Sequence, residues 1–200
     1  MSRSSSALLR TPPSANARRG GLLTLVLGLL GCSSNPPLPT VAAVDLQRFM
    51  GPWFVLAHIP AGAEKNGYNG VESYELRPDG KVGTTYVFRK GGFDGKLETM
   101  RPVGRVVDKT TNAAWGMEFF WPFEAEYLIT YLETDYSATI IARTKRDYAW
   151  IMARTPELPE ERLQALESEL ARQGYDLSKL RRMPQRWPDA EHPNSPASGR

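Results

Sequence analysis

Few residues of this chain have the types and spacing that catalysis or metal binding would need. The two histidines, His58 and His192, have no cysteine or carboxylate cluster beside them at metal-ligand spacing. The adjacent acids Glu160 and Glu161 are typical of a solvated surface rather than of paired catalytic acids. The sequence has no nucleophile elbow and no phosphate-binding loop. It therefore predicts no enzyme, no metal site and no cofactor.

Cys32 is the single cysteine, and its position suggests chemistry of another kind. It follows residues 22–31, an apolar run too short to span a bilayer, which comes after an Arg-containing start as in a secretory signal. The join Leu29-Leu30-Gly31-Cys32 resembles the bacterial lipobox, in which the cysteine thiol is linked to diacylglycerol. We therefore expect a lipoprotein signal peptide at 1–31 and lipid attachment at Cys32. An ordinary signal peptide with an incidental cysteine is the alternative.

The residues after Cys32 bear on where the protein is held. Residues 32–43 are Pro-rich and uncharged, which is typical of an extended tether. Ser33, rather than an aspartate, follows the cysteine, and in the usual bacterial sorting pattern this favours the outer membrane. We expect the N-terminal lipid anchor to hold the protein on the bacterial cell outer membrane, on its periplasmic face.

The distribution of charge argues against one class of partner. The formal charge of the whole chain is +3, but residues 1–31 contain four arginines and no acid. The remainder has 21 Lys and Arg against 22 Asp and Glu. A nucleic-acid partner therefore has no electrostatic support.

Short strand-like segments at hairpin spacing make up most of the chain after residue 44. Turn signals such as Pro78-Asp79-Gly80 separate them. Eight antiparallel strands in series close into an up-and-down β-barrel, which removes exposed edges and has room for one small ligand. The sequence thus predicts an all-β domain over 44–187. Its strands are expected at 53–60, 71–77, 81–89, 96–108, 113–121, 124–133, 136–143 and 148–154.

Helical patterns flank the predicted strands. Leu46, Phe49 and Met50 form one side of a short helical turn before the first strand. Leucines at helical spacing over 159–174, with charges on the other face, predict an α-helix packed outside the barrel. The tail 188–200 is rich in proline and polar residues and is predicted to be disordered.

Three motifs in order resemble those of the lipocalin family. Gly51-Pro52-Trp53 is similar to its G-x-W signature, and Thr134-Asp135-Tyr136 to its T-D-Y motif between two late strands. Arg154 stands where lipocalins place an arginine that packs across the signature tryptophan. The resemblance implies that these motif residues form the barrel floor. Residues 146–156 and 174–179 are similar to the bacterial outer-membrane lipocalins related to apolipoprotein D, which implies a possible homodimer.

The period of two along a strand predicts which side chains line the barrel. If Trp53 points inward, so do Val55 and Ala57, whereas His58 points outward. Applying the register of the lipocalin family extends this set around the barrel. The predicted ligand-binding residues are Val55, Ala57, Tyr74, Thr84, Tyr86, Phe88, Trp115, Met117, Phe119, Ile129, Tyr131 and Trp150.

This apolar and aromatic lining suits a long acyl chain. We expect the protein to bind fatty acids or lysophospholipids for storage, scavenging or transport in the cell envelope. One alternative is a filled barrel that serves as a scaffold for a protein partner. Another is an enzyme acting on a lipid or isoprenoid, which would need a polar pair inside the cavity, such as Glu72 beside a tyrosine.

Overall fold

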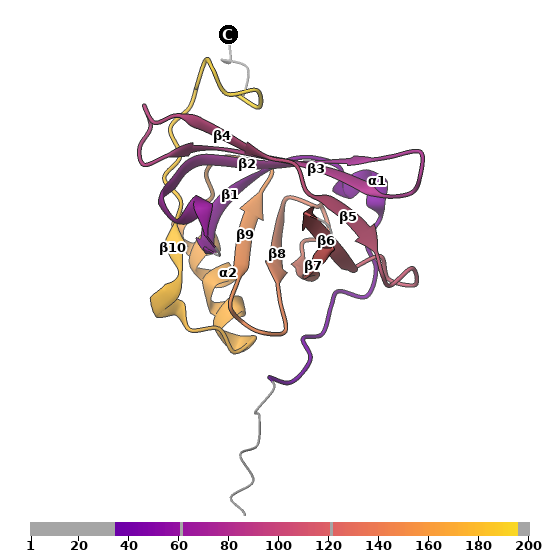
Figure 1. Ribbon diagram of the computed structural model, residues 1–200. Helices are drawn as coiled ribbons and strands as arrows, with labels where there is room; N and C mark the ends of the chain where they lie inside the picture. Colours follow the sequence, from indigo (N-terminus) through magenta and orange to yellow (C-terminus); the bar gives the residue numbers. More distant parts are fainter. Residues whose placement is uncertain (1–34, 61, 121, 196–200) are drawn as a thin grey trace, which may run out of the picture. The chain divides into compact units, whose positions relative to one another are not determined.

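The computed structural model describes residues 35–60, 62–120 and 122–195 (Figure 1). The predicted signal peptide and Cys32 lie outside these residues. Among the described helices, none has the length and apolar character needed to cross a membrane. The elements are α1 (Leu46–Phe49), β1 (Gly51–Ile59), η1 (Ala63–Asn66), β2 (Gly67–Leu76), β3 (Val82–Lys90), β4 (Leu97–Met100), β5 (Val103–Val106), β6 (Ala114–Phe120), β7 (Phe123–Leu132), β8 (Ala138–Ala142), β9 (Ala149–Ala153), α2 (Glu160–Arg172), η2 (Leu177–Lys179) and β10 (Arg181–Arg182).

The strands form one antiparallel sheet that closes on itself. Successive strands pair along the chain, and β9 pairs back with β1, for example at Val55 and Met152. β4 and β5 both pair with β3 and act as two halves of one strand, interrupted at Arg101 and Pro102 because proline cannot donate to a ladder. With these halves counted together and β10 set apart, the barrel has eight strands, as the sequence predicts.

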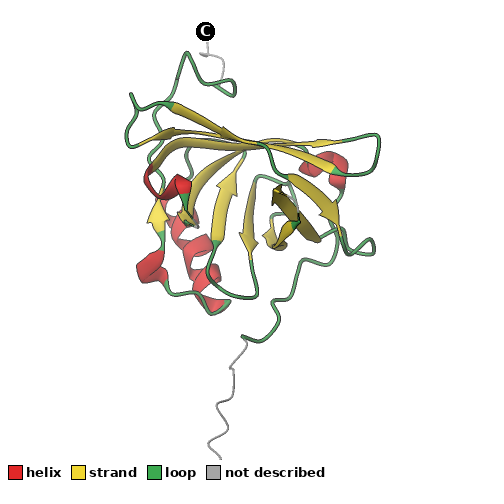
Figure 2. Ribbon diagram, viewed as in Figure 1, coloured by secondary structure: helices red, strands yellow, loops and turns green. Residues whose placement is uncertain are grey.

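Apolar side chains form one core inside the barrel and another outside it. The inner core includes Phe49, Trp53 and Trp115, all of them almost fully buried. The outer core joins the outward faces of β1, β8 and β9 to α2 through Leu166 and Leu170. Figure 2 shows α2 on the outside of the barrel, which confirms the helix and the short helical turn predicted at the two ends.

A segment after α2 fills a gap in the barrel wall. β1 and β2 pair directly only over the first four residues of β1. Beyond that point β10 pairs with β1, Met183 N donates to Leu56 O at 2.8 Å, and Asn69 N donates to Pro184 O at 3.0 Å. The Met183 side chain is 3% exposed and belongs to the inner core. Residues 181–184 therefore complete the wall between β1 and β2.

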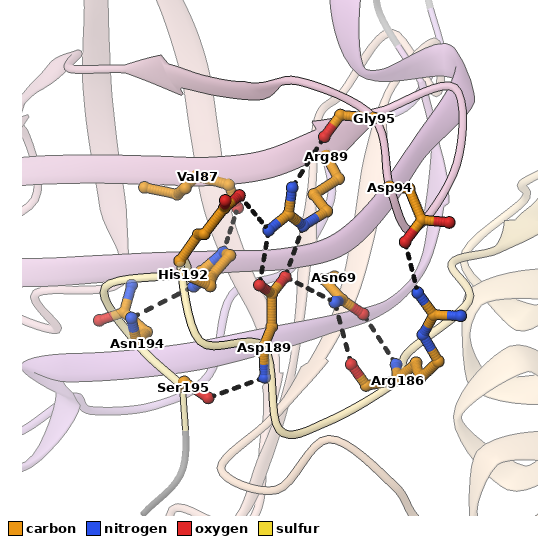
Figure 3. A network of polar contacts seen from close by, with 11 residues as sticks. Asn69, Val87, Arg89, Asp94, Gly95, Arg186, Asp189, His192, Asn194 and Ser195 are labelled. Carbon is orange, nitrogen blue, oxygen red and sulfur yellow. Dashed lines mark hydrogen bonds and ion pairs between the residues drawn. The ribbon is translucent and has the colours of Figure 1, made fainter.

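The prediction of disorder after Trp187 is wrong for residues 188–195, which we call the C-terminal strap. Figure 3 shows the strap crossing β2 and β3, where Arg89 donates two hydrogen bonds of 2.6 Å to Asp189. Asn69 also donates to Asp189, and the buried His192 ring lies 3.3 Å from the carbonyl of Val87. The polar composition suggested solvation, but here the polar groups pair with the barrel. Residues 196–200 lie outside the described residues.

Residues 35–43 likewise pack on the barrel rather than forming a free tether. Leu38 is buried in the outer core, and Val41 N donates to Ile129 O at 3.0 Å. The Asn35 side chain donates to Lys145 O at 3.0 Å. The predicted spacer is therefore part of the domain over these residues, because its apolar side chains have a surface to cover.

Candidate ligand-binding site

A cavity of about 530 Å³ opens inside the barrel. Arg143 and Tyr148, from the two ends of the β8–β9 turn, line it, as do Gly62 and Glu64 from the loop before β2. We call this end of the barrel the mouth. The opposite end, occupied by Trp53 and the start of β1, is the closed end. The volume falls within the range of about 300–1,000 Å³ that is usual for small-molecule sites.

Most of the predicted lining residues lie inside the barrel, at two depths. Tyr86, Phe119 and Trp150 line the cavity itself, with Phe119 44% exposed at the mouth, and Met117 lines a small adjoining hollow. A second group is buried inside the barrel but does not line the cavity. Its apolar members belong to the inner core, and its polar member Thr84 donates to the sulfur of Met117. This group is Val55, Tyr74, Thr84, Phe88, Trp115 and Ile129.

Two of the predicted lining residues, Ala57 and Tyr131, belong instead to the outer core. The pairing of β1 with β9 shifts between Val55 and Ala57, and that of β7 with β8 shifts between Ile129 and Tyr131. Such a β-bulge places an extra residue in one strand and reverses the alternation beyond it. The parity prediction therefore fails at these positions.

The bulge in β1 also turns His58 to the inner side, opposite Trp150 on β9. His58 is completely buried, and neither ring nitrogen has a hydrogen-bond partner within the described residues. Burial lowers the pKa of His58 to about 4, and the nearby Arg181 adds to the decrease. The prediction that this side chain points outward is wrong, and the imidazole is neutral at pH 7.

Acid is expected to destabilise the protein through His58. The pKa of His58 is about 4 in the folded chain and about 6.5 in the unfolded chain. As the pH falls, the unfolded chain therefore binds a proton at a higher pH than the folded chain does, and this favours unfolding. Stability should drop by about 3 kcal/mol between pH 6.5 and 4. Urea unfolding of wild type and His58→Leu at several pH values over this range gives the free energy of unfolding of each protein. The difference between the two free energies isolates the effect of His58, because the contributions of the other titrating groups cancel. A difference that does not change with pH would contradict the assignment.

A carboxyl group and two phenols meet at the inner end of the cavity. Tyr74 donates a hydrogen bond to Oε2 of Glu72, and the Tyr74 and Tyr127 hydroxyl groups are hydrogen-bonded to each other. Burial raises the pKa of Glu72 to about 8, the bond from Tyr74 lowers it, and Glu64 raises it further. Burial also raises the pKa of both tyrosines. All three groups therefore keep their protons at neutral pH.

The closed end is held by contacts between the G-x-W segment and Arg154. The guanidinium lies 3.8 Å from the Trp53 ring centroid and donates to Pro52 O at 2.8 Å and Phe49 O at 3.1 Å. The Trp53 indole N–H also donates to Phe49 O, at 2.9 Å. Gly51 has φ +89°, a conformation that glycine adopts without strain. The arginine therefore joins the end of β9 to the start of β1.

The T-D-Y corner binds the chain just before β1. Tyr136 has φ +64° at the turn between β7 and β8, and its hydroxyl oxygen accepts from Asp45 N at 2.8 Å. The Asp45 side chain accepts from Gln47 N and Arg48 N and so caps α1. Arg48 in turn donates to Thr134 O at 3.1 Å. These bonds fix α1 beneath the barrel.

Several cavity residues were absent from the predicted set. Arg101 and Pro102 come from the break between β4 and β5, which a pattern of alternation does not locate in space. Arg143 and Tyr148 could have been found from the strand ends that carry them, because the mouth is where those ends meet. The additional lining residues are Gly62, Glu64, Glu72, Met100, Arg101, Pro102, Ala125, Arg143 and Tyr148.

Comparison with known proteins agrees with this geometry. Residues 44–185 match the family described as "Lipocalin-like domain". Outer membrane lipoprotein Blc of Escherichia coli K12 is 30% identical over 157 residues, covering 76% of this chain and 87% of the relative. Temperature-induced lipocalin-1 of Arabidopsis thaliana is 29% identical, covering 74% and 83%. Apolipoprotein D of Macaca fascicularis is also 29% identical, covering 76% and 81%.

Solved structures show the same fold at lower identity. Insecticyanin from the tobacco hornworm Manduca sexta superposes with a TM-score of 0.59 at 19% identity, covering 78% of this chain and 87% of that one. Allergen Per a 4 from cockroaches superposes with a TM-score of 0.56 at 18% identity, covering 76% and 96%. These likenesses concern the barrel alone.

Proposed function

Because the chain belongs to the lipocalin-like family, we propose that it binds fatty acids or lysophospholipids in its barrel and holds them for storage, scavenging or transport in the cell envelope. The observation that carries the proposal is the open cavity of about 530 Å³ inside a closed barrel. Aromatic and aliphatic side chains such as Tyr86, Met100 and Trp150 line most of it.

Burial of an acyl chain supplies the binding free energy. At about 0.8 kcal/mol per methylene, about ten buried methylenes contribute roughly 8 kcal/mol before the cost of ordering the ligand. Micromolar affinity corresponds to about 8 kcal/mol, so a few polar contacts suffice to offset that cost. Arg101 and Arg143 line the cavity and suit a carboxylate or phosphate headgroup. Selectivity among unsubstituted chains of similar length should be low.

The cellular location is part of the same proposal. Lipid attachment at Cys32 would hold the protein on the outer membrane, on the periplasmic face. The similarity to relatives named outer membrane lipoprotein Blc supports this location. A homodimer stays a prediction from the resemblance.

The two alternatives fare differently. An open cavity does not fit a filled scaffold barrel. The Glu72–Tyr74 pair meets the geometric condition for the lipid-modifying enzyme. However, raised pKa values keep both groups protonated at neutral pH, so neither is a ready base. Members of the family generally bind or transport small hydrophobic molecules, and binding is the function that we propose.

Filling the cavity should abolish binding without unfolding the barrel. Ala125 lines the cavity, and Ala125→Trp is expected to weaken binding of a fluorescent fatty acid at least tenfold by taking the space of the chain. Val107→Trp, at a 54% exposed position near the closed end, is the matched control and should bind like wild type.

Direct binding assays test the proposal itself. Palmitate and a palmitoyl lysophospholipid should displace the fluorescent fatty acid at micromolar concentration. Mass spectrometry of lipid extracts from the purified protein should find such ligands. Failure of both lipids to displace the probe from wild type would overturn the proposed function.

A further inference from the structure

Glu72 is a buried carboxyl group with one oxygen available to hydrogen-bond a ligand in the cavity. Its side chain lines the cavity, although the residue is only 2% exposed. Tyr74 satisfies Oε2, whereas Oε1 accepts no hydrogen bond from any residue that the structure describes. Burying a polar oxygen against hydrocarbon without a partner is unfavourable. A plain acyl chain would leave Oε1 in that state.

Arg143 and Glu72 line the cavity at different depths. Arg143 belongs to the turn at the mouth, whereas Glu72 pairs across the sheet with Trp53, the residue of the closed end. An anionic headgroup is favoured beside the Arg143 cation at the mouth, whereas the protonated Glu72 offers it no opposite charge. The ligand's chain, rather than its head, therefore reaches Glu72.

We propose that the cavity selects acyl chains that carry a hydroxyl group, which forms a hydrogen bond with Oε1 of Glu72 while the anionic head stays at the mouth. This inference rests on the proposed function and adds the chemical class of the chain. Tyr74 and Tyr127 hold the Glu72 side chain in place from the other side. The raised pKa of Glu72 fits this role, because a neutral carboxyl is tolerated in an apolar cavity and its Oε1 can donate a hydrogen bond to a ligand hydroxyl or accept one from it.

Matched ligands test the proposal in the full-length protein. Palmitate is compared with 10-hydroxypalmitate and 16-hydroxypalmitate, which carry the hydroxyl in the middle and at the end of the chain, by displacement of a fluorescent fatty acid. At least one of the two should bind wild type about tenfold more tightly than palmitate, the effect of one well-formed hydrogen bond in a buried site. The ligand 2-hydroxypalmitate, whose hydroxyl stays beside the head, is the control and should show no preference that depends on Glu72.

Variants of Glu72 assign the preference to its carboxyl group. Glu72→Met removes the acceptor at similar size, so it should abolish the preference and bind unsubstituted palmitate more tightly than wild type does. Glu72→Gln keeps an acceptor oxygen and should retain most of the preference. Equal affinity of wild type for all four fatty acids, or a preference that persists in Glu72→Met, would overturn the inference and leave the proposed function standing. If none of the fatty acids binds wild type, the inference is wrong, and the proposed function is wrong as well if the palmitoyl lysophospholipid also fails to bind.

Discussion

Replacement of Trp53 with alanine is expected to lower the free energy of unfolding by about 3–5 kcal/mol. Trp53 is fully buried and packs 5.1 Å from the Phe49 ring centroid. Its loss would leave a cavity at the closed end and expose the face that Arg154 covers. The contact between that guanidinium and the indole contributes about 1 kcal/mol of the total.

Chemical denaturation measures this effect, with Trp53→Phe as the matched control. Phenylalanine keeps an aromatic ring in the space but loses the N–H bond to the carbonyl of Phe49, so its effect should be clearly smaller. If Trp53→Ala unfolds at the same denaturant concentration as wild type, the closed end does not stabilise the barrel in this way.

Removal of the Asp189 carboxylate is the second large effect that we expect. The side chains of Arg89 and Asp189 are only 9% and 8% exposed and share two hydrogen bonds (Figure 3). Asp189→Ala leaves the Arg89 guanidinium buried, with Glu191, whose side chain is 76% exposed, as its remaining anionic partner. Breaking a buried pair from one side costs about 3–5 kcal/mol.

The pH dependence of this pair has a definite sign. The hydrogen bonds from Arg89 hold the pKa of Asp189 well below its ordinary value. The pair therefore contributes fully at neutral pH, and its contribution is lost as the pH falls below the ordinary range of an aspartate. The difference in stability between wild type and Asp189→Ala should shrink only in strong acid.

An exposed pair in the same region provides the control. Arg186 donates to Asp94 at 3.0 Å, but the two side chains are 58% and 96% exposed. Asp94→Ala should change stability by less than about 1 kcal/mol. Equal effects of Asp94→Ala and Asp189→Ala would mean that the strap is not anchored by the buried pair.

The eight strands could be predicted because they rest on local signals, and the closed end because its motifs resemble those of lipocalins. Alternation and turn residues recur along the chain, and the G-x-W and T-D-Y segments impose their own geometry at Gly51 and Tyr136. The bulge in β1 could not be predicted in the same way. The run Val55-Leu56-Ala57 is apolar throughout, so one extra residue leaves no break in the pattern, yet it reverses the side of the sheet on which His58 lies.

Order in the C-terminal strap depends on a partner that is distant in sequence. This segment of prolines and polar residues would fail to fold alone, because it can bury little apolar surface. Arg89, which lies 100 residues before Asp189, supplies the buried counter-charge. The sequence likewise did not predict that Glu72, Tyr74 and Tyr127 meet. It named Glu72 beside a tyrosine only as a requirement for an enzyme, since a strand pattern does not show which inward side chains lie close together.

If lipid attachment at Cys32 holds the protein on a membrane, as we propose, the path of residues 35–44 bears on which end of the barrel meets that membrane. Asn35 is bonded to Lys145, in the turn between Arg143 and Tyr148 at the mouth, and Val44 N donates to Thr111 O in the turn between β5 and β6. Cys32 precedes Asn35 by three residues, so a lipid on Cys32 would be tethered at most about 10 Å from the rim of the mouth. The opening would then face the bilayer, and a fatty acid could pass from leaflet to barrel without crossing bulk water.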